Sequence, residues 1–357
     1  MVKKIFYAIV IAIVLLVSIS FFLPKTVHVE RHVDIDRPAS TVFALVNGYA
    51  TIKTWSPWAS RDPSAVYEIS GPASGVGARM EWEGDPRLSG KGWQEITESV
   101  PFSLVRVQLH FDQQGMATAY FSIQDRAGAG AATLTWGFDT DLTSDQSLAG
   151  EMVAKYFGLL FDRWIGSDYE TGLANLKTLA ESLPDVDFSG LEVEVVDVAP
   201  MDILFVQSDS SQDPADLAST LASAYQEITA FMVENDMEMS AQPMTITRAW
   251  SESGYAFDAA IPVVMKEVTL TGNVEAGKSP SGRAVRVIHR GPYDRMMPTY
   301  EKLSAYMTAN GLREGTVSWE HYISDPGKTP GNELITYIYF QIEPDAGELQ
   351  HGSHDTK

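Results

Sequence analysis

The sequence predicts an α+β protein in which an apolar N-terminal segment precedes two domains, each an antiparallel sheet packed on helices. Three observations carry this prediction. Residues 5–23 contain no charged residue, period-two alternation dominates residues 66–142, and a strand, helix, strand, strand pattern occurs twice after residue 190. The chain beyond residue 25 is long enough for two domains of about 150 residues.

The N-terminal segment, residues 1–25, is predicted to be a transmembrane anchor. As a helix, its apolar run at residues 5–23 would be about 28 Å long, close to the thickness of a bilayer's hydrocarbon core. Lys3 and Lys4 precede the run, and the positive-inside rule keeps that end in the cytoplasm. We therefore expect a single-pass protein whose remaining chain lies in the periplasm or outside the cell.

A cleaved signal peptide is the alternative interpretation of the same segment. Its apolar region would usually be about 7–15 residues long and would end in small residues. Here the run continues into Phe21, Phe22 and Leu23, and only Ser18 and Ser20 resemble a cleavage site. The sequence favours the uncleaved anchor.

Composition narrows the function classes. The net charge of -21 argues against nucleic-acid binding, which requires a basic surface, and against docking on anionic lipid beyond the anchor itself. The chain has no cysteine, which excludes disulfides, thiolate metal sites and a cysteine nucleophile. No spacing typical of a metal site or a phosphate-binding loop occurs, so we expect no metal and no cofactor.

The first domain is predicted to span residues 26–183. Residues 26–36 alternate as a half-buried strand, and Pro38 opens a short helix. An antiparallel meander follows through residue 142. A long amphipathic helix over residues 149–183 closes the domain, and the sheet is expected to wrap it around a cavity. Its apolar residues recur near helical spacing: Phe157, Phe161, Trp164, Leu173, Leu176 and Ala180.

The second domain is predicted to span residues 190–344, after a linker at 184–189. Asp213 and Pro214 begin a helix that runs to about residue 233, and two strands follow it. The plan then repeats with a strand at 284–289, a helix at 296–310 and two more strands. This pseudo-two-fold pattern suggests a groove between the halves. The tail at residues 345–357 is polar and expected to be disordered.

The first domain resembles the polyketide-cyclase/START-like superfamily (SRPBCC), often described as helix-grip domains. The resemblance rests on residues 29–43, on Trp55-Ser56-Pro57-Trp58 with Arg61-Asp62-Pro63, and on residues 165–177. It covers nearly the whole domain. It implies a cavity for an apolar or amphipathic small molecule without identifying that molecule, because functions differ widely within the fold.

The second domain resembles the GyrI-like effector-binding domain found at the end of AraC- and MerR-type regulators. The matching stretches are residues 289–293, 300–306, 319–326 and 333–339. Many relatives carry Thr-Glu where this chain has Thr336-Tyr337, and a proline where it has Gln341. The missing carboxylate would be the partner of a cationic ligand, or the acid/base in hydrolytic relatives. The regulators' helix-turn-helix is also absent.

Candidate site residues gather in both domains. In the second, aromatic residues are predicted to line a cage that holds a lipophilic ligand by stacking and cation–π contact. Ordinary sheet packing is the alternative. Trp319 and Tyr322 have opposite parity on one strand, so both line one pocket only if a bulge intervenes. The cage candidates are Phe257, Tyr293, Trp319, Tyr322, Tyr337 and Tyr339.

Glu320 is the one weak catalytic candidate, as a general base or as an acceptor for a ligand's charge, provided its strand turns it into the groove. A solvated strand carboxylate is the competing interpretation. In the first domain, Trp55 and Trp58 are predicted to rim the cavity mouth, with Arg106 and Glu81 as polar anchors, although core or edge packing accounts for them equally well.

The favoured interpretation is a bacterial inner-membrane protein that binds a hydrophobic or amphipathic small molecule for sensing, sequestration or transfer at the envelope. It requires no catalysis. A hydrolase acting on a strained or electrophilic compound through the GyrI-like groove is the first alternative, and a protein-interaction scaffold with collapsed cavities is the second. The sequence identifies no protein partner.

Overall fold

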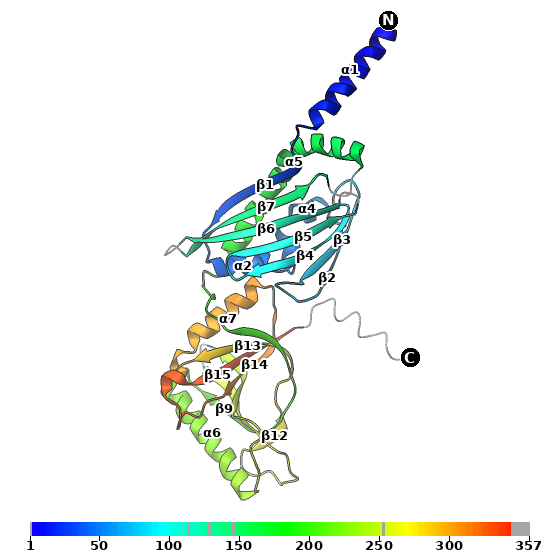
Figure 1. Cartoon of the computed structure of the whole chain (residues 1–357). Helices are drawn as coiled ribbons and strands as arrows, with labels where there is room; N and C mark the ends of the chain where they lie inside the picture. The colour runs from blue at the N-terminus through cyan, green and yellow to red at the C-terminus, as the bar shows by residue number, and fades with distance from the viewer. Residues whose placement is uncertain (1, 113–114, 127–129, 144–146, 252–253, 344–357) are drawn as a thin grey trace, which may run out of the picture. The chain divides into compact units, whose positions relative to one another are not determined.

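The computed structural model describes residues 2–112, 115–126, 130–143, 147–251 and 254–343, so the predicted tail at residues 345–357 lies outside the described part of the chain. The chain divides into two compact units, residues 1–189 with 308–311 and residues 190–307 with 312–357. Figure 1 shows the secondary-structure elements of both.

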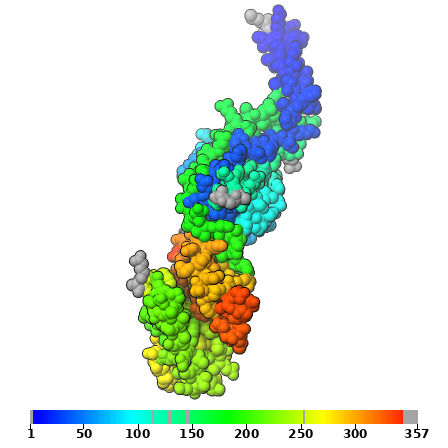
Figure 2. Space-filling model, turned by 90° about the vertical axis from the view of Figure 1, so that its left-hand side faces the viewer, coloured from blue at the N-terminus to red at the C-terminus, as the bar shows by residue number. Residues whose placement is uncertain are grey.

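The N-terminal helix α1 (Val2–Ser20) is apolar on all sides. The segment Lys3–Ser20 of this helix has a mean hydropathy of 2.1 and is long enough to cross a membrane. An N-terminal signal sequence has the same properties. Figure 2 shows its side chains uncovered by the rest of the chain on the face in view, and Phe6 and Ile11 are 62% and 60% exposed. Such a helix suits either a membrane anchor or a signal sequence.

The first unit is built on a seven-stranded antiparallel sheet in the order β1-β7-β6-β5-β4-β3-β2. Period-two alternation places Val105 and Val107 in the core and Arg106 on the other face. Three short helices, α2 (Ala39–Val46), α3 (Ile52–Trp55) and α4 (Pro57–Arg61), connect β1 to β2. The strands are β1 (Thr26–Ile35), β2 (Val66–Ser70), β3 (Arg79–Glu83), β4 (Lys91–Val100), β5 (Leu104–Phe111), β6 (Gly115–Arg126) and β7 (Ala131–Asp141).

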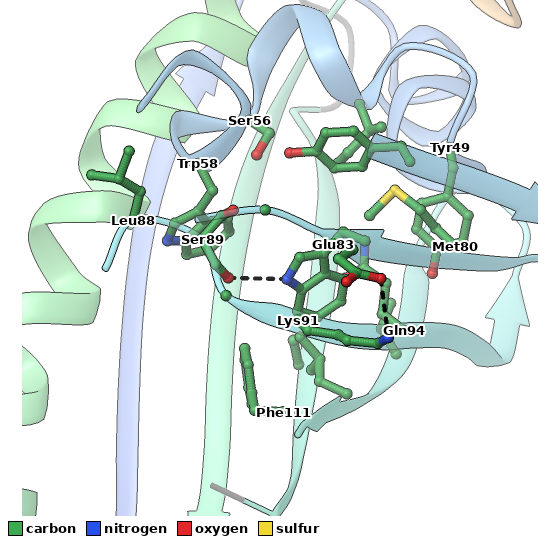
Figure 3. A pocket seen from close by; sticks show the side chains of 18 of the residues that line it. Tyr49, Ser56, Trp58, Met80, Glu83, Leu88, Ser89, Lys91, Gln94 and Phe111 are labelled. Carbon is green, nitrogen blue, oxygen red and sulfur yellow. Dashed lines mark hydrogen bonds and ion pairs between the residues drawn. The ribbon is translucent and has the colours of Figure 1, made fainter. Parts of the chain in front are cut away.

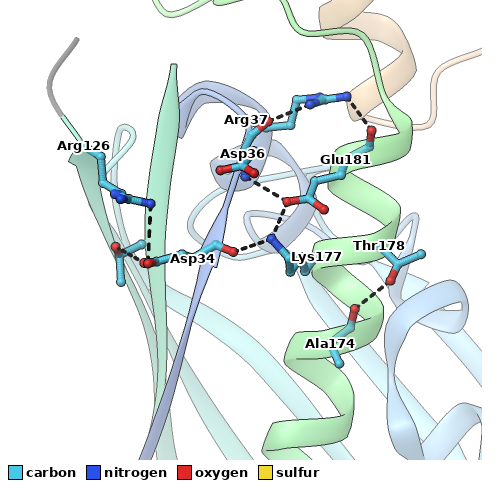
Figure 4. Close-up of polar contacts among 9 residues, drawn as sticks. Asp34, Asp36, Arg37, Arg126, Ala174, Lys177, Thr178 and Glu181 are labelled. Carbon is cyan, nitrogen blue, oxygen red and sulfur yellow. Dashed lines mark hydrogen bonds and ion pairs between the residues drawn. The ribbon is translucent and has the colours of Figure 1, made fainter. Parts of the chain in front are cut away.

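Helix α5 (Leu148–Ser182) packs on the inner face of this sheet, as the sequence predicted. Its C-terminal part is fastened to the end of β1 by polar contacts (Figure 4). Lys177 Nζ donates to the Asp34 carbonyl at 2.7 Å, and the Asp36 amide donates to the Glu181 carboxylate at 3.0 Å. Arg37 donates to the carbonyl oxygens of Glu181 and Leu183. These bonds hold the helix across the sheet and so maintain the space between them.

The N-terminal part of α5 differs from the expected core stripe. Phe161 packs on the core, and Leu173 is 2% exposed, whereas Phe157 and Trp164 are 52% and 49% exposed. The prediction that all of these residues form one core stripe was therefore wrong for Phe157 and Trp164. A 35-residue helix is about 52 Å long, whereas the longest strand of this sheet, β6, spans about 40 Å at most. The helix therefore extends beyond the sheet that could cover it.

The second unit contains one eight-stranded antiparallel sheet in the order β12-β9-β11-β10-β14-β15-β13-β8. The order confirms the pseudo-two-fold repeat, because β8-β9-α6-β10-β11 and β12-β13-α7-β14-β15 occupy equivalent positions about the β10–β14 pair. The first strand of each half pairs with a strand of the other half, β8 with β13 and β12 with β9. The elements are β8 (Val193–Val198), β9 (Asp202–Ser210), α6 (Pro214–Glu234), β10 (Met244–Ser251), β11 (Gly254–Pro262), β12 (Glu275–Lys278), β13 (Gly282–Arg290), α7 (Met297–Ala309), β14 (Glu314–Tyr322) and β15 (Ile335–Ile342).

Both helices of the second unit lie on the same face of its sheet. Cross-strand pairing aligns Ala259, Thr245, Glu320 and Ile338 in one row on that face. Ala259 belongs to the core under α6, and Ile338 belongs to the core under α7. Glu320 and Thr245 consequently lie at the centre of the sheet, between the areas that the two helices cover.

Candidate ligand-binding sites

The first unit encloses a cavity of about 620 Å³ between its sheet, α3, α4 and α5 (Figure 3). This volume lies within the usual range for small-molecule sites, about 300–1,000 Å³. The sheet contributes Met80 and Val107, which are buried. The cavity that the sequence predicted for this domain is therefore present.

Aromatic side chains form much of the cavity wall. Trp136 stacks on Tyr169 with ring centroids 3.9 Å apart and on Phe121 at 5.1 Å. Trp55 meets the edge of Trp136 at 5.5 Å, and Trp58 meets it at 5.8 Å. Interlocked rings of this kind make a rigid apolar wall, because each ring restricts the rotation of the next.

Three polar atoms in this wall have no hydrogen-bond partner among the described residues. They are Tyr49 Oη, Trp55 Nε1 and Trp136 Nε1, and all three belong to cavity-lining side chains. A buried donor without a partner costs about 1–3 kcal/mol. Burial also raises the pKa of Tyr49, so its hydroxyl keeps its proton and can donate. All three atoms are themselves buried within the wall, so a ligand's acceptor would reach them only after the neighbouring side chains shift.

Asp62, at the end of α4, holds the turn between β3 and β4 at the cavity mouth. Its carboxylate accepts hydrogen bonds from the Ser89 hydroxyl at 2.6 Å and from the Asp85 amide at 2.8 Å. Bonds from Ser89, Ser64 and the Asp85 amide lower the pKa of Asp62 to about 2. A Cβ on Gly84 would lie 2.3 Å from Asp62 Oδ2, so a larger residue there would displace the Asp62 carboxylate from these bonds.

The residues predicted at this mouth are distributed differently. Trp55 is 2% exposed and lies in the cavity wall rather than at the rim, and Trp58 lines the cavity while its Nε1 donates to Asp168 at 3.1 Å. Arg106 lies on the outer face of the sheet, where it pairs with Glu98 at 3.0 Å. Glu81 pairs with Arg79 at 3.0 Å and does not line the cavity.

The second unit places a group of hydroxyls around Glu320, which we call the Glu320 cluster. Tyr300 on α7 donates to Glu320 Oε1 at 2.5 Å, and Tyr322 donates to Oε2 at 2.6 Å. The Tyr322 hydroxyl also meets Thr245 Oγ1 at 2.9 Å, which lies 3.2 Å from the hydroxyl of Tyr225 on α6. The cluster therefore joins both helices through the centre of the sheet.

The electrostatics of the cluster depend on one carboxylate in a poorly solvated place. Burial raises the pKa of Glu320, and the hydrogen bonds from Tyr300 and Tyr322 partly oppose this effect. Burial and the neighbouring carboxylate raise the pKa of both tyrosines well above the usual value, so their hydroxyls remain donors. The arrangement can receive a proton or a positive charge at Glu320.

The proposed aromatic cage is divided between the two faces of the sheet. Tyr293 lies beside the Glu320 cluster, with its ring centroid 5.3 Å from that of Tyr322. Trp319 and Tyr339 stack at 4.7 Å on the opposite face, and Tyr337 packs with them. Phe257 is fully buried under α6. The pairing at Glu320 has no bulge, so the strand alternation that separates Trp319 from Tyr322 is kept.

Several residues of these sites carried no assigned role in the sequence analysis. They are Tyr49 and Trp136 in the cavity and Tyr225, Thr245 and Tyr300 in the Glu320 cluster. Alternation with Leu134 and Phe138 could have indicated that Trp136 faces inward, but no sequence signal pairs Tyr225 on its helix with Thr245 on a strand. Among the residues that the structure describes, no three His, Asp or Glu side chains form a group that could hold a metal ion.

Comparison with family models defines the class of each unit. Residues 26–181 match the model described as polyketide cyclase / dehydrase and lipid transport, and residues 191–343 match the GyrI-like small molecule binding domain. The chain therefore joins an SRPBCC domain to a GyrI-like domain, and both are small-molecule-binding domains. No curated protein matches the chain significantly.

Solved structures resemble part of the chain at low identity. A hydrolase from Listeria innocua is 17% identical, with 42% of this chain and 91% of that chain covered and a TM-score of 0.33. The C-terminal domain of EcmrR is 19% identical, with coverages of 43% and 98% and a TM-score of 0.36. Protein CV1439 from Chromobacterium violaceum is 18% identical, with coverages of 45% and 100% and a TM-score of 0.31.

Proposed function

We propose that this chain is a membrane-anchored binding protein that takes a hydrophobic or amphipathic small molecule into the cavity of its SRPBCC domain. The observation that carries the proposal is the cavity of about 620 Å³ with a wall of packed aromatic side chains. The scaffold interpretation requires collapsed cavities. An open cavity of this size argues against it for the first domain.

The chemistry of the wall restricts the ligand. Apolar rings such as Trp136 and Phe121 favour a hydrocarbon or aromatic body, because transfer of such a body from water is favourable by about 25 cal/mol per Å². The lining donors of Arg87 and Lys91 favour acceptor oxygens on the same ligand. A carboxylate, ester or carbonyl attached to an apolar body meets both conditions.

Helix α1 supports the proposed location. Its length and apolar surface suit a bilayer span, and Lys3 and Lys4 favour a cytoplasmic N-terminus with both domains in the periplasm or outside the cell. Retention of the chain in membranes after alkaline carbonate washing tests this part. Release into the wash would instead indicate that the segment is removed as a signal sequence.

Thermal unfolding of the full chain in detergent tests the cavity. A long-chain fatty acid and the corresponding fatty alcohol are added at increasing concentration, and unfolding of the first domain is followed. A ligand that binds only the folded state raises Tm with concentration, and about 100 times its Kd adds about 2.7 kcal/mol of stability. Ala119→Phe, which fills the cavity from β6, should abolish the rise. An unchanged wild-type Tm throughout the series would contradict the proposal.

A second function is favoured by the Glu320 cluster. A poorly solvated carboxylate held by Tyr300 and Tyr322 suits either a cationic ligand or a general base that takes a proton from water attacking an electrophile. With an aryl epoxide as probe, Glu320→Gln should lose turnover and keep binding. Unchanged turnover would eliminate Glu320 as the base.

A further inference from the structure

One end of the first sheet lies next to the N-terminal helix. β1 begins at Thr26, a short distance along the chain from the end of α1 at Ser20. Antiparallel pairing aligns Thr26 with Asp141, Phe111 with Gly115, and Glu83 with Lys91. The end of β7 and the turn between β3 and β4 therefore lie at the same end of the sheet as the start of β1.

The cavity opens at this end. Its deep lining residues, such as Val107 and Trp136, are buried, whereas the exposed lining residues belong mostly to the turn at residues 83–91. Figure 3 shows Leu88 and Lys91 on this turn, and Leu88 is 45% exposed. A ligand that enters through the mouth must therefore pass the end of the domain from which α1 emerges.

The first part of α5 lies at the same end. A Cβ on Gly158 would lie 3.1 Å from Val27 Cγ2 and 2.5 Å from Leu142 Cδ1, so this part of the helix packs against the start of β1 and the chain just after β7. An apolar stripe on its other side faces away from the core. The stripe comprises Val153, Phe157, Leu160 and Trp164, which recur at helical spacing and are 56%, 52%, 42% and 49% exposed.

The charges of this end differ from those of the whole chain. Residues 147–165 contain two acidic and two basic residues, and so do residues 83–91, so each segment has a net charge of zero in a chain of -21. Lys155 is 4% exposed and pairs with Glu151 at 2.6 Å, which removes both charges from the apolar stripe. These segments do not repel an anionic bilayer as the rest of the chain would.

We propose that this end of the SRPBCC domain lies in the membrane interface, with the α5 stripe and Leu88 in contact with lipid, so that the cavity exchanges its ligand directly with the bilayer. The occupant is the bilayer rather than a protein, because this part of α5 contacts the apolar helix α1, where the Tyr156 hydroxyl donates to the Leu16 carbonyl at 2.6 Å. Trp, Phe and Leu side chains are also those of interfacial helices. The ligand is then a lipid or another molecule that partitions into membranes. This inference rests on the anchor in the proposed function.

Single-cysteine labelling tests the surface, since the natural chain has no cysteine. Phe157→Cys, Leu88→Cys and a control, Val100→Cys, are each labelled with a nitrobenzoxadiazole fluorophore in the full chain. The proteins are reconstituted in phosphatidylcholine vesicles with and without 5-doxyl phosphatidylcholine. Val100 is 43% exposed and ends β4 at the opposite end of the sheet from Lys91, so it matches the test sites in exposure but not in position.

Lipid-borne doxyl groups should quench the labels at Phe157 and Leu88 at least twofold more strongly than the label at Val100. Equal quenching at all three sites, in protein that floats with the vesicles, would contradict the proposed lipid contact of the α5 stripe and Leu88 but would leave the membrane anchor supported. Protein that does not float with the vesicles would contradict both the lipid contact and the membrane anchor. Because the test positions are half exposed, these substitutions leave the core unchanged.

Discussion

Trp55 and Trp136 meet edge to face in the wall of the first-domain cavity, with ring centroids 5.5 Å apart, and neither indole Nε1 has a hydrogen-bond partner among the described residues. The two side chains come from α3 and β7, so helix and sheet both contribute to the wall. A concave space with a wall of packed aromatic rings is typical of small-molecule sites.

Filling the cavity should cost little stability. Ala119→Phe adds a ring beside empty space, and we expect a change in the free energy of unfolding of less than about 1 kcal/mol, or a gain. Ala132→Phe is the matched control, because Ala132 is fully buried but does not line the cavity, and overpacking there should cost about 1–3 kcal/mol. Denaturant unfolding measures both. Equal losses would indicate that no usable space exists beside Ala119.

Asp62 should control the order of the cavity mouth. Asp62→Asn weakens the bonds from Ser64, Ser89 and the Asp85 amide, so hydrogen exchange of residues 85–90 should accelerate. Glu68→Gln, which changes an exposed carboxylate on neighbouring β2, should leave that exchange unaltered. The same protection in both variants would show that Asp62 does not hold the turn.

The lowered pKa of Asp62 gives this contact a pH dependence. The folded-state pKa is about 2 and the ordinary value is 3.8, so the folded state holds the proton less tightly than the unfolded chain. The stabilisation is therefore present above pH 3.8 and is lost as the pH falls toward 2. Thermal unfolding between pH 2 and 5 should show a smaller acid-induced decrease of Tm in Asp62→Asn than in the wild type.

Removing one hydroxyl from the Glu320 cluster should destabilise the second domain. Tyr322→Phe deletes the 2.6 Å bond to the carboxylate, and bonds to charged groups of this kind contribute about 1–3 kcal/mol. The pKa of Glu320 should rise further, because that hydrogen bond lowers it. Tyr293→Phe keeps every bond to Glu320 and serves as the control in chemical unfolding. Equal stability of the two variants would refute the role given to Tyr322.

Glu320 should make the second domain less stable as the pH rises. Its pKa is raised above the ordinary 4.5, so the folded state binds the proton more tightly than the unfolded chain does. Its contribution is fully present below pH 4.5 and is lost as the pH rises through the folded-state pKa. Chemical unfolding at pH 4 to 8 should show this decrease in the wild type relative to Glu320→Gln. Parallel profiles would contradict it.

Local patterns were sufficient to predict the two sheets, because alternation along strands such as β5 is a property of neighbouring residues. The repeat also predicted the pseudo-two-fold arrangement that the strand order of the second sheet shows. The contact between Tyr300 and Glu320 required the tertiary fold, since it joins a helix to a strand across the helix-covered face. The exposure of Phe157 was missed because a buried apolar stripe and an exposed apolar stripe have the same helical period.

The most direct test of the central claim is native mass spectrometry of the full chain released from detergent micelles, followed by solvent extraction. We expect the wild type and Glu320→Gln to carry one copy of an apolar small molecule with acceptor oxygens, and Ala119→Phe to carry none. A wild-type protein without a bound molecule, or an Ala119→Phe protein that retains it, would contradict binding in the first-domain cavity.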